Sequence, residues 1–153
     1  MFLLDTNVWL ELMLNQERAD EVRSLMLAAP FSEIAITEFS IYSIGLTLSR
    51  LKSDALFVKF VSDIIEDTQT TRIRLDPDGL KKIADAKSRF RFDFDDAYQY
   101  VAAEKHNLTL VSFDADFDRT ERGRKTPADI LGEPPVARDK PPTKPARRRS
   151  RKP

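Results

Sequence analysis

Four short runs of apolar and β-branched residues recur along the first 111 positions, and each has the length of a buried strand. The stretches between them repeat their apolar residues every three or four positions, which is the spacing of an amphipathic helix. The predicted strands are residues 2–4, 34–36, 71–75 and 108–111.

Polar and helix-terminating residues divide the stretches between the strands into helices. The first stretch is broken near Asn15 and Gln16 and ends before Pro30, because a proline ring is incompatible with a continuing helix. Later starts are marked by capping side chains or by proline, the residues preferred at helix N-termini. The predicted helices are residues 8–28 in two parts, 37–51, 53–65, a helix from 76 onward with Leu80, Ile83 and Ala84 on one side, and 93–105.

The order of these elements is strand, helix, helix, repeated three times and closed by a fourth strand. Short apolar strands that alternate with helices are typical of a parallel sheet with helices on both faces. We therefore predict an α/β fold of three layers, α/β/α, with a central parallel sheet of four to five strands. Such sheets bind their ligands at the carboxyl ends of the strands.

The composition excludes several classes of protein. The chain has 153 residues, the length of a single domain, and contains no cysteine and one histidine. These counts exclude a disulfide framework, a thiolate nucleophile, a cysteine-based metal site and a multi-histidine site within one chain. The apolar runs are too short to span a membrane and the N-terminus lacks the pattern of a signal peptide, so we expect a cytoplasmic protein without membrane contact.

The formal net charge of zero conceals two oppositely charged parts. Residues 137–153 contain eight Lys or Arg, one acidic residue and four prolines, whereas residues 1–136 contain 17 basic and 24 acidic residues. Since it has no large apolar side chain, the basic segment cannot offset the entropy cost of folding. We predict a domain over residues 1–136 and a disordered, basic, Pro-rich tail over residues 137–153.

Acidic residues follow the predicted strands, at the edge of the sheet where ligands bind. Asp5 closes the first strand, Glu38 lies two residues after the second, and Asp114 and Asp116 follow the fourth. Asp96 lies at the start of the helix that leads into the fourth strand. We expect these five carboxylates to share one edge of the sheet. Each acid could instead cap a helix or a turn, but capping does not explain why acids follow three separate strands.

Carboxylates that are held together repel one another unless a cation neutralises them. Oxygen ligands select hard cations, here Mg²⁺ with Mn²⁺ as the alternative. Acid clusters that hold such ions catalyse phosphodiester hydrolysis, because the metal lowers the pKa of bound water and offsets charge on the phosphate oxygens. The pattern therefore predicts a metal-dependent hydrolase that needs no protein nucleophile.

Three segments carry a resemblance to a known family. They are F-L-L-D-T-N-V-W-L-E at residues 2–11, T-E-F-S at 37–40 and F-D-D-A-Y-Q-Y-V-A-A-E-K-H-N-L-T-L-V-S-F-D-A-D-F at 94–117. With them the chain resembles PIN-domain ribonucleases over about residues 1–131, and its size is similar to that of toxin subunits of VapBC-type toxin–antitoxin pairs. The third segment is the most specific, since an acid precedes Ala at a helix start and a strand ends in a hydroxyl residue followed by acids.

The resemblance implies a Mg²⁺-dependent endoribonuclease that acts as a type II toxin. It also implies an RNA substrate, an antitoxin protein as partner and assembly into a homodimer. The acids that it implies as catalytic metal ligands are Asp5, Glu38, Asp96 and Asp114, with Asp116 as an auxiliary ligand. Thr6 and Ser112 match hydroxyl positions that hold the acids or a metal-bound water in place.

Other functions stay open at this point. An aspartyl-nucleophile phosphatase also begins with a strand that ends in Asp, but its general acid two residues on would here be Asn7. A non-catalytic RNA-binding scaffold and a housekeeping RNA-processing nuclease of the same fold are further alternatives. We expect Trp9 to pack in the core and His106 to lie at a helix end on the surface, so neither is assigned to the chemistry.

The predicted dimer needs an apolar surface. Two of the predicted helical segments, the second part of residues 8–28 and residues 53–65, carry large apolar side chains. We expect four of these side chains to form an exposed surface larger than a monomer usually leaves open. They are Met26, Leu27, Phe57 and Phe60.

Overall fold

The computed structural model describes residues 1–132, and the predicted basic tail of residues 137–153 lies outside the described residues. In the described part, four strands form one sheet in the order β3-β2-β1-β4, and every neighbouring pair is parallel. The register pairs Leu3 of the central strand with Ala35 and with Leu110. The strands are β1 (Phe2–Leu4), β2 (Ile34–Thr37), β3 (Thr71–Ile73) and β4 (Thr109–Val111). The predicted α/β fold is confirmed, with four parallel strands.

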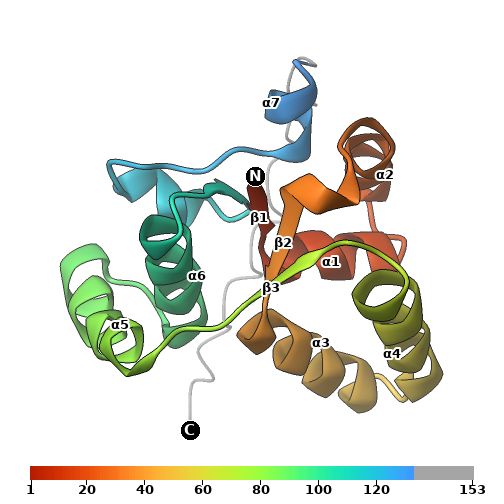
Figure 1. Ribbon diagram of the computed structural model, residues 1–153, viewed down its shortest axis with the longest axis horizontal. Coiled ribbons are helices and arrows are strands. Elements are labelled where there is room, and N and C mark those ends of the chain that lie inside the picture. Colours follow the sequence, from red (N-terminus) through yellow and green to blue (C-terminus); the bar gives the residue numbers. More distant parts are fainter. Residues whose placement is uncertain (133–153) are drawn as a thin grey trace, which may run out of the picture.

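Helices cover both faces of this sheet (Figure 1). Figure 1 shows α5 and α6 on one side of the strands, α1 to α4 on the other side, and α7 at the top of the view. The helices of the described residues are α1 (Thr6–Met13), α2 (Ala19–Ala28), α3 (Glu38–Arg50), α4 (Asp54–Phe60), α5 (Pro77–Phe90), α6 (Phe94–Lys105) and α7 (Pro127–Leu131). Shorter helical turns span Phe31–Glu33, Val61–Glu66 and Ala115–Arg119.

The side chains of the strands alternate between two hydrophobic cores, because successive residues of a strand point to opposite faces. Leu3 and Ala35 pack with α5 and α6 on one face of the sheet. Leu4, Ile34 and Ile36 pack on the other face with residues of α1, α2 and α3. Both faces of the sheet are therefore buried, and its carboxyl edge is the part that can hold polar groups.

The third strand is shorter than predicted, and the other strands differ from their predicted ends by at most one residue. The third strand stops at Ile73 because the backbone N–H of Leu75 donates to the hydroxyl of Tyr98 on α6, at 3.2 Å, and so leaves the sheet. A fifth strand does not form within the described residues. Instead, a single parallel bridge joins Val111 to Lys125 beside β4.

Helix α5 buries a different face from the one that its periodicity predicted. Asp76 caps this helix as expected, and its side chain accepts from the backbone N–H of Gly79 at 2.9 Å. The buried face is formed by Gly79, Ile83, Ala86 and Phe90, whereas Leu80 is 47% exposed. A Cβ atom at Gly79 would lie 3.0 Å from the side chain of Leu75, so this position packs closely against the segment that precedes the helix.

The predicted apolar surface is only partly present. Phe60 is buried and packs edge-on against Trp9, with ring centroids 5.5 Å apart, so it belongs to the core and not to the surface. Phe57 is half-buried against Gly45, and Leu27 is the one strongly exposed member of the predicted set, at 90%. The expectation of a continuous surface formed by all four side chains is therefore wrong.

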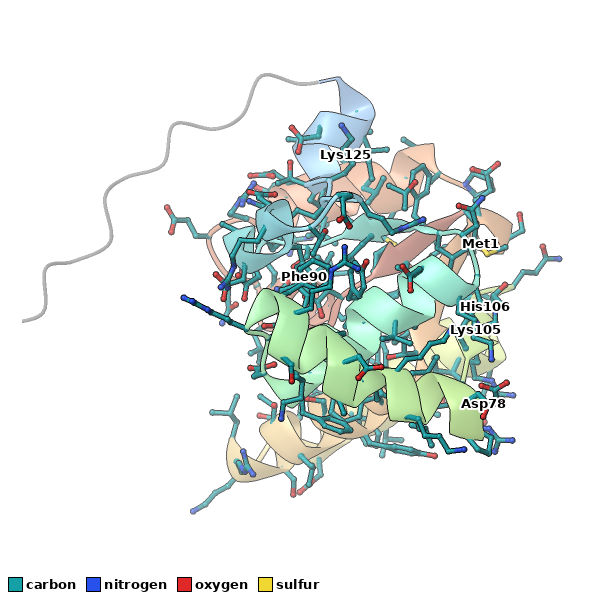
Figure 2. The ribbon with its side chains drawn as sticks, turned by 90° about the vertical axis from the view of Figure 1, so that its left-hand side faces the viewer. Met1, Asp78, Phe90, Lys105, His106 and Lys125 are labelled. Atoms are coloured by element: carbon teal, nitrogen blue, oxygen red, sulfur yellow. The ribbon has the colours of Figure 1, made fainter. Side chains whose placement is uncertain are left out.

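Trp9 and His106 lie where the sequence predicted them. Trp9 is fully buried, and its indole N–H donates to the carbonyl of Leu4 at 3.2 Å. His106 ends α6, and Figure 2 shows it on the same side of the molecule as Met1, where the strands begin. The carboxyl ends of the strands lie at the opposite edge of the sheet. Within residues 1–132, no helix has both the length and the apolar character that crossing a membrane requires.

Candidate metal centre

The backbone at the carboxyl edge of the sheet presents acids from three separate segments. Asp5 directly follows β1 and caps α1, and its side chain accepts from the backbone N–H of Thr6 at 2.7 Å. Asp96 lies in the first turn of α6, which is capped by Asp93. Asp114 follows β4 and caps the short turn after it. Asp5 and Asp114 therefore cap helical turns and also belong to the group of acids at this edge. A capping role does not exclude a role in the cluster.

Three carboxylates form the centre of the cluster. One oxygen atom from each of Asp96, Asp114 and Asp116 lies within 4.8 Å of the others. Asp96 and Asp114 are half-buried, and Asp116 is exposed. We call these three residues the acid triad. Their role as metal ligands stays a prediction, but the structure brings them together from segments that are about twenty residues apart in the chain.

Asp5 lies at the buried side of the acid triad. Its second carboxylate oxygen accepts from the hydroxyl of Ser112 at 2.7 Å and from the amide of Asn7 at 2.9 Å. Burial raises the pKa of Asp5 to about 6; the hydrogen bonds from Ser112 and Thr6 oppose this shift, and the charge of Asp114 adds to it. The protein therefore holds this carboxylate in a fixed orientation but at an electrostatic cost.

The electrostatics of Asp96 show how strongly the acids act on one another. Burial raises the pKa of this carboxyl to about 7, and the neighbouring charges of Asp93, Asp114, Asp5 and Asp116 contribute to the rise. All four neighbours are anionic when ionised, so each of them opposes the ionisation of Asp96. Such an arrangement attracts a cation or a proton.

Asp95 also belongs to this electrostatic environment. Burial, followed by the charge of Asp93, raises the pKa of its carboxyl. Its charge in turn contributes to the raised pKa of Asp5. The sequence prediction selected Asp96 over Asp95, and the structure places Asp96, not Asp95, in the acid triad.

Glu38 lies at the same edge but outside the acid triad. It is the first residue of α3, directly after β2, and it is half-buried. Its helix is capped by Thr37, whose hydroxyl accepts from the backbone N–H of Ser40 at 2.9 Å. The structure therefore brings four of the five predicted acids into one electrostatic group and leaves Glu38 beside it.

A buried polar network supports the floor of this edge. The hydroxyl of Thr6 donates to the hydroxyl of Ser40 at 3.0 Å, and the amide of Gln99 donates to Ser40 at 2.6 Å and to Thr37 at 3.2 Å. Gln99 is fully buried on α6. The network therefore ties the first turns of α1 and α3 to the second turn of α6.

Two residues of the site, Asn7 and Gln99, were not assigned a role from the sequence. Asn7 donates to both Asp5 and Ser112, at 2.9 and 3.0 Å, and its carbonyl accepts from the backbone N–H of Phe113 at 3.2 Å. It therefore holds the ends of β1 and β4 together. The position of Asn7, two residues after Asp5, could have indicated its role. For Gln99 the sequence offers only that it is a polar residue on a largely apolar helix.

The cationic side chain paired with the acid triad is that of Arg119. Its guanidinium forms an ion pair with Asp116, and its Nε also donates to the backbone carbonyl of the same residue at 3.2 Å. Arg124 instead pairs with Asp118 at 3.3 Å and donates to the carbonyl of Ser112 at 3.0 Å. Arg119 therefore neutralises the exposed end of the acid triad and leaves Asp5 and Asp96 without a paired cation among the described residues.

The PIN domain family matches residues 2–123, which is most of the chain. The chain belongs to this family. The match begins at β1 and extends past Asp116, so it includes every acid of the cluster. No curated protein matches the chain in sequence.

Several solved structures have the same fold. A toxin–antitoxin complex from Klebsiella pneumoniae is 20% identical with a TM-score of 0.65, and the match covers 83% of this chain and 98% of that one. VapC20 of Mycobacterium tuberculosis, a toxin that cleaves the sarcin–ricin loop, is 15% identical with a TM-score of 0.67, and the match covers 77% and 93%. FitAB bound to an IR36 DNA fragment is 19% identical with a TM-score of 0.71, and the match covers 83% and 95%. At these identities the likeness establishes the fold of this PIN domain.

Proposed function

We propose that this PIN domain is a Mg²⁺-dependent endoribonuclease. The observation that carries the proposal is the acid triad, which lies next to buried Asp5 at the carboxyl edge of a parallel sheet. Ligands bind at this edge in open parallel sheets. A cluster of carboxylates there has the donor set of a hard divalent cation and the location of a substrate site.

The residues present fit such a cation. Asp96, Asp114 and Asp116 offer carboxylate oxygens close enough to share one ion, and Asp5 adds a fourth acid on the buried side. The raised pKa values of Asp5 and Asp96 indicate that this part of the protein favours added positive charge. When bound, a divalent cation activates water and offsets the charge on the phosphate oxygens.

The surrounding side chains position the acids. Ser112 and Asn7 hold one oxygen of Asp5, and the Ser112 hydroxyl also accepts from the backbone N–H of Asp114 at 3.0 Å. One hydroxyl therefore links the acid after β1 to the acid after β4. Because these acids are anchored before any ligand arrives, little reorganisation is needed when a substrate phosphate binds.

We also propose that the protein acts as a type II toxin, with an antitoxin protein as its partner and a homodimer as its assembly. The structures that support this are the toxin–antitoxin complex and the sarcin–ricin loop cleaving toxin. A housekeeping nuclease of the same fold would have the same acid triad. Growth arrest on expression, relieved by a small neighbouring gene, would support the toxin; normal growth with retained cleavage would support the housekeeping role.

The test of catalysis is cleavage of total RNA in Mg²⁺, with EDTA as the metal-free reference. Asp5→Asn and Asp114→Asn should each abolish cleavage, since each removes an acid of the cluster. Asp118→Asn is the matched control, because Asp118 is an acid of the same segment that pairs with Arg124 outside the acid triad. RNA binding without cleavage by the wild-type chain would instead support the RNA-binding scaffold. Cleavage that persists in EDTA would contradict the metal-dependent mechanism.

A further inference from the structure

An aromatic side chain is exposed next to the acids of the site. Phe94 is the first residue of α6, directly after the capping Asp93 and directly before Asp95, and it is 45% exposed. Of the phenylalanines that flank Asp114 and Asp116 in the chain, Phe113 is half-buried and Phe117 is fully buried. The ring of Phe94 is therefore the most exposed apolar surface among the phenylalanines next to the acids in the chain.

Phe94 is supported from below by two further rings. Its ring centroid lies 5.6 Å from that of Phe39, at an interplanar angle of 52°. Phe39 in turn stacks on Tyr98, with centroids 5.0 Å apart and an angle of 25°. Tyr98 is buried, and its hydroxyl accepts from the backbone N–H of Leu75 at 3.2 Å. We call Phe94, Phe39 and Tyr98 the aromatic ladder, because the three rings lead from the core to the surface.

The aromatic ladder and the acid triad each include a residue from the first turn of α6. Successive residues of an α-helix are rotated by about 100°, so Phe94 and Asp96, two positions apart, leave nearly opposite sides of this turn. Asp96 lies on the side of Asp114, and Phe94 lies on the side of Phe39. Phe39 directly follows Glu38 in α3. The two groups of side chains therefore share one helix end, with Asp95 between them.

Buried hydrogen bonds next to Tyr98 hold α6 and α3 in a fixed relation, which orders the inner part of the aromatic ladder. Gln99 of α6 donates to Ser40 of α3 at 2.6 Å and to Thr37 at 3.2 Å. Both hydrogen bonds are buried. An aromatic ring that is ordered before binding loses little conformational entropy when a ligand stacks on it.

We propose that Phe94, supported by Phe39, is a stacking subsite for an unpaired base of the RNA substrate. The proposal rests on the proposed ribonuclease function, because a nucleic acid whose phosphate lies at the acids must place its neighbouring bases nearby. An aromatic face binds any base, because every base has a π-face. Stacking on Phe94 supplies an attraction that does not depend on charge, in addition to any attraction between the phosphates and a cation held by the acids. The subsite selects single-stranded RNA, since paired bases do not offer their faces.

The test compares binding of a short oligouridylate and of an abasic ribose–phosphate chain of the same length. All variants are made in an Asp5→Asn background so that the RNA stays intact. Phe94→Ala and Phe94→Leu should each weaken oligouridylate binding by roughly five- to a hundredfold, the range for loss of one base–aromatic stack. Neither variant should change binding of the abasic chain. Leu80→Ala is the matched control, because Leu80 is equally exposed on α5, and it should leave both affinities unchanged.

A second variant tests stacking directly. Phe94→Trp should keep the affinity for oligouridylate, and its indole fluorescence should be quenched on binding, against the constant signal of buried Trp9. Equal oligouridylate binding by Phe94→Ala and the parent would overturn the proposal, as would a change of oligomeric state in Phe94→Ala by light scattering. Cleavage by the chain with native Asp5 is measured separately. If the native chain cleaves RNA but the Phe94 substitutions leave oligouridylate binding unchanged, only the stacking subsite is overturned. If the Phe94 substitutions weaken oligouridylate binding but the native chain does not cleave RNA, only the nuclease function is overturned.

Discussion

Replacing Asp5 with Asn should stabilise the metal-free protein at neutral pH relative to acidic pH. Asp5 is 6% exposed, and burial raises the pKa of its carboxyl from 3.8 to about 6. The ionised carboxylate is therefore less favourable in the folded chain than in the unfolded chain. A tenfold change in the acid dissociation constant corresponds to about 1.4 kcal/mol. Above pH 6, ionisation of Asp5 therefore lowers the free energy of unfolding by about 3 kcal/mol.

The substitution also changes contacts, but these changes do not depend on the charge of Asp5. An Asn side chain can still accept from the backbone N–H of Thr6. Its amide N–H groups would face the hydroxyl of Ser112, which already accepts from Asn7 and from the backbone N–H of Asp114, and the amide of Asn7, which donates in its present orientation. Each hydrogen bond lost in this way costs about 1 kcal/mol at any pH. The pH dependence of the difference between the two proteins therefore isolates the charge.

The sign follows from linkage. A carboxyl whose folded pKa is raised stabilises the fold while it is protonated, and this contribution is lost as pH rises through the folded pKa. The advantage of Asp5→Asn over wild type should therefore grow by most of about 3 kcal/mol between about pH 4 and about pH 7. Removal of this charge also lowers the repulsion on Asp96, which acts in the same direction.

The assay is urea denaturation in EDTA at a series of pH values. Unfolding is followed by the fluorescence of Trp9, the one tryptophan of the chain, which is fully buried. Asp76→Asn provides a control of opposite sign, because the hydrogen bond from Lys105 and then the backbone N–H of Gly79 lower the pKa of Asp76. That variant should be less stable than wild type at neutral pH, and the difference should shrink as pH falls through the lowered pKa.

A difference between Asp5→Asn and wild type that stays constant from about pH 4 to about pH 7 would refute the reasoning. It would mean that Asp5 ionises in the folded protein as easily as in the unfolded one. The hydrogen bonds from Ser112 and Thr6 would then outweigh the effect of burial. The raised pKa of Asp96 would need the same revision, because the two acids share their surroundings.

Four further predictions follow from the site, the assembly and the charge distribution. Mn²⁺ at a hundred times its dissociation constant should stabilise the chain by about 2.7 kcal/mol in urea titrations, and Asp96→Asn should remove most of this effect. Arg119→Gln should tighten Mn²⁺ binding in calorimetry, because the guanidinium paired with Asp116 no longer competes; weaker binding would argue against competition. Light scattering at tens of micromolar should show a dimer, and a monomer would contradict this. Deletion of residues 137–153 should flatten the slope of log RNA affinity against log salt by at most about 5 to 6, whereas tighter RNA binding by the truncated chain would show that the tail competes for the site.

The order of strands and helices could be predicted from the sequence because it depends on local patterns. The apolar runs that form β1 and β2 and the caps at Thr37 and Asp76 act within a few residues. A parallel sheet follows from the alternation of strands and helices, and its carboxyl edge follows from chain direction. These rules also placed acids of distant segments at one edge before any distance was known.

The packed structure alone decided which face of each helix is buried and which acid joins its neighbours. Periodicity favoured Leu80 as a buried residue of α5, but the helix buries Gly79, Ile83, Ala86 and Phe90, because its packing against α6 decides which side faces the core. Phe60 was expected in an exposed apolar surface, but it is buried against Trp9, a contact between residues too far apart in the chain for a local pattern to reveal.

The same reason limits what the sequence determined about the site. Asp5 and Asp114 could be selected by their places after strands, and the Ala that follows Asp96 marked that acid by family resemblance. The side-chain direction of Glu38, by contrast, depends on how α3 packs, and this places it beside the acid triad and not within it. Burial of Asp5, which sets its charge state, comes from α1 and β4 closing around it. Chain order thus determines which residues reach the edge of the sheet, while three-dimensional packing determines their distances, their burial and their charge.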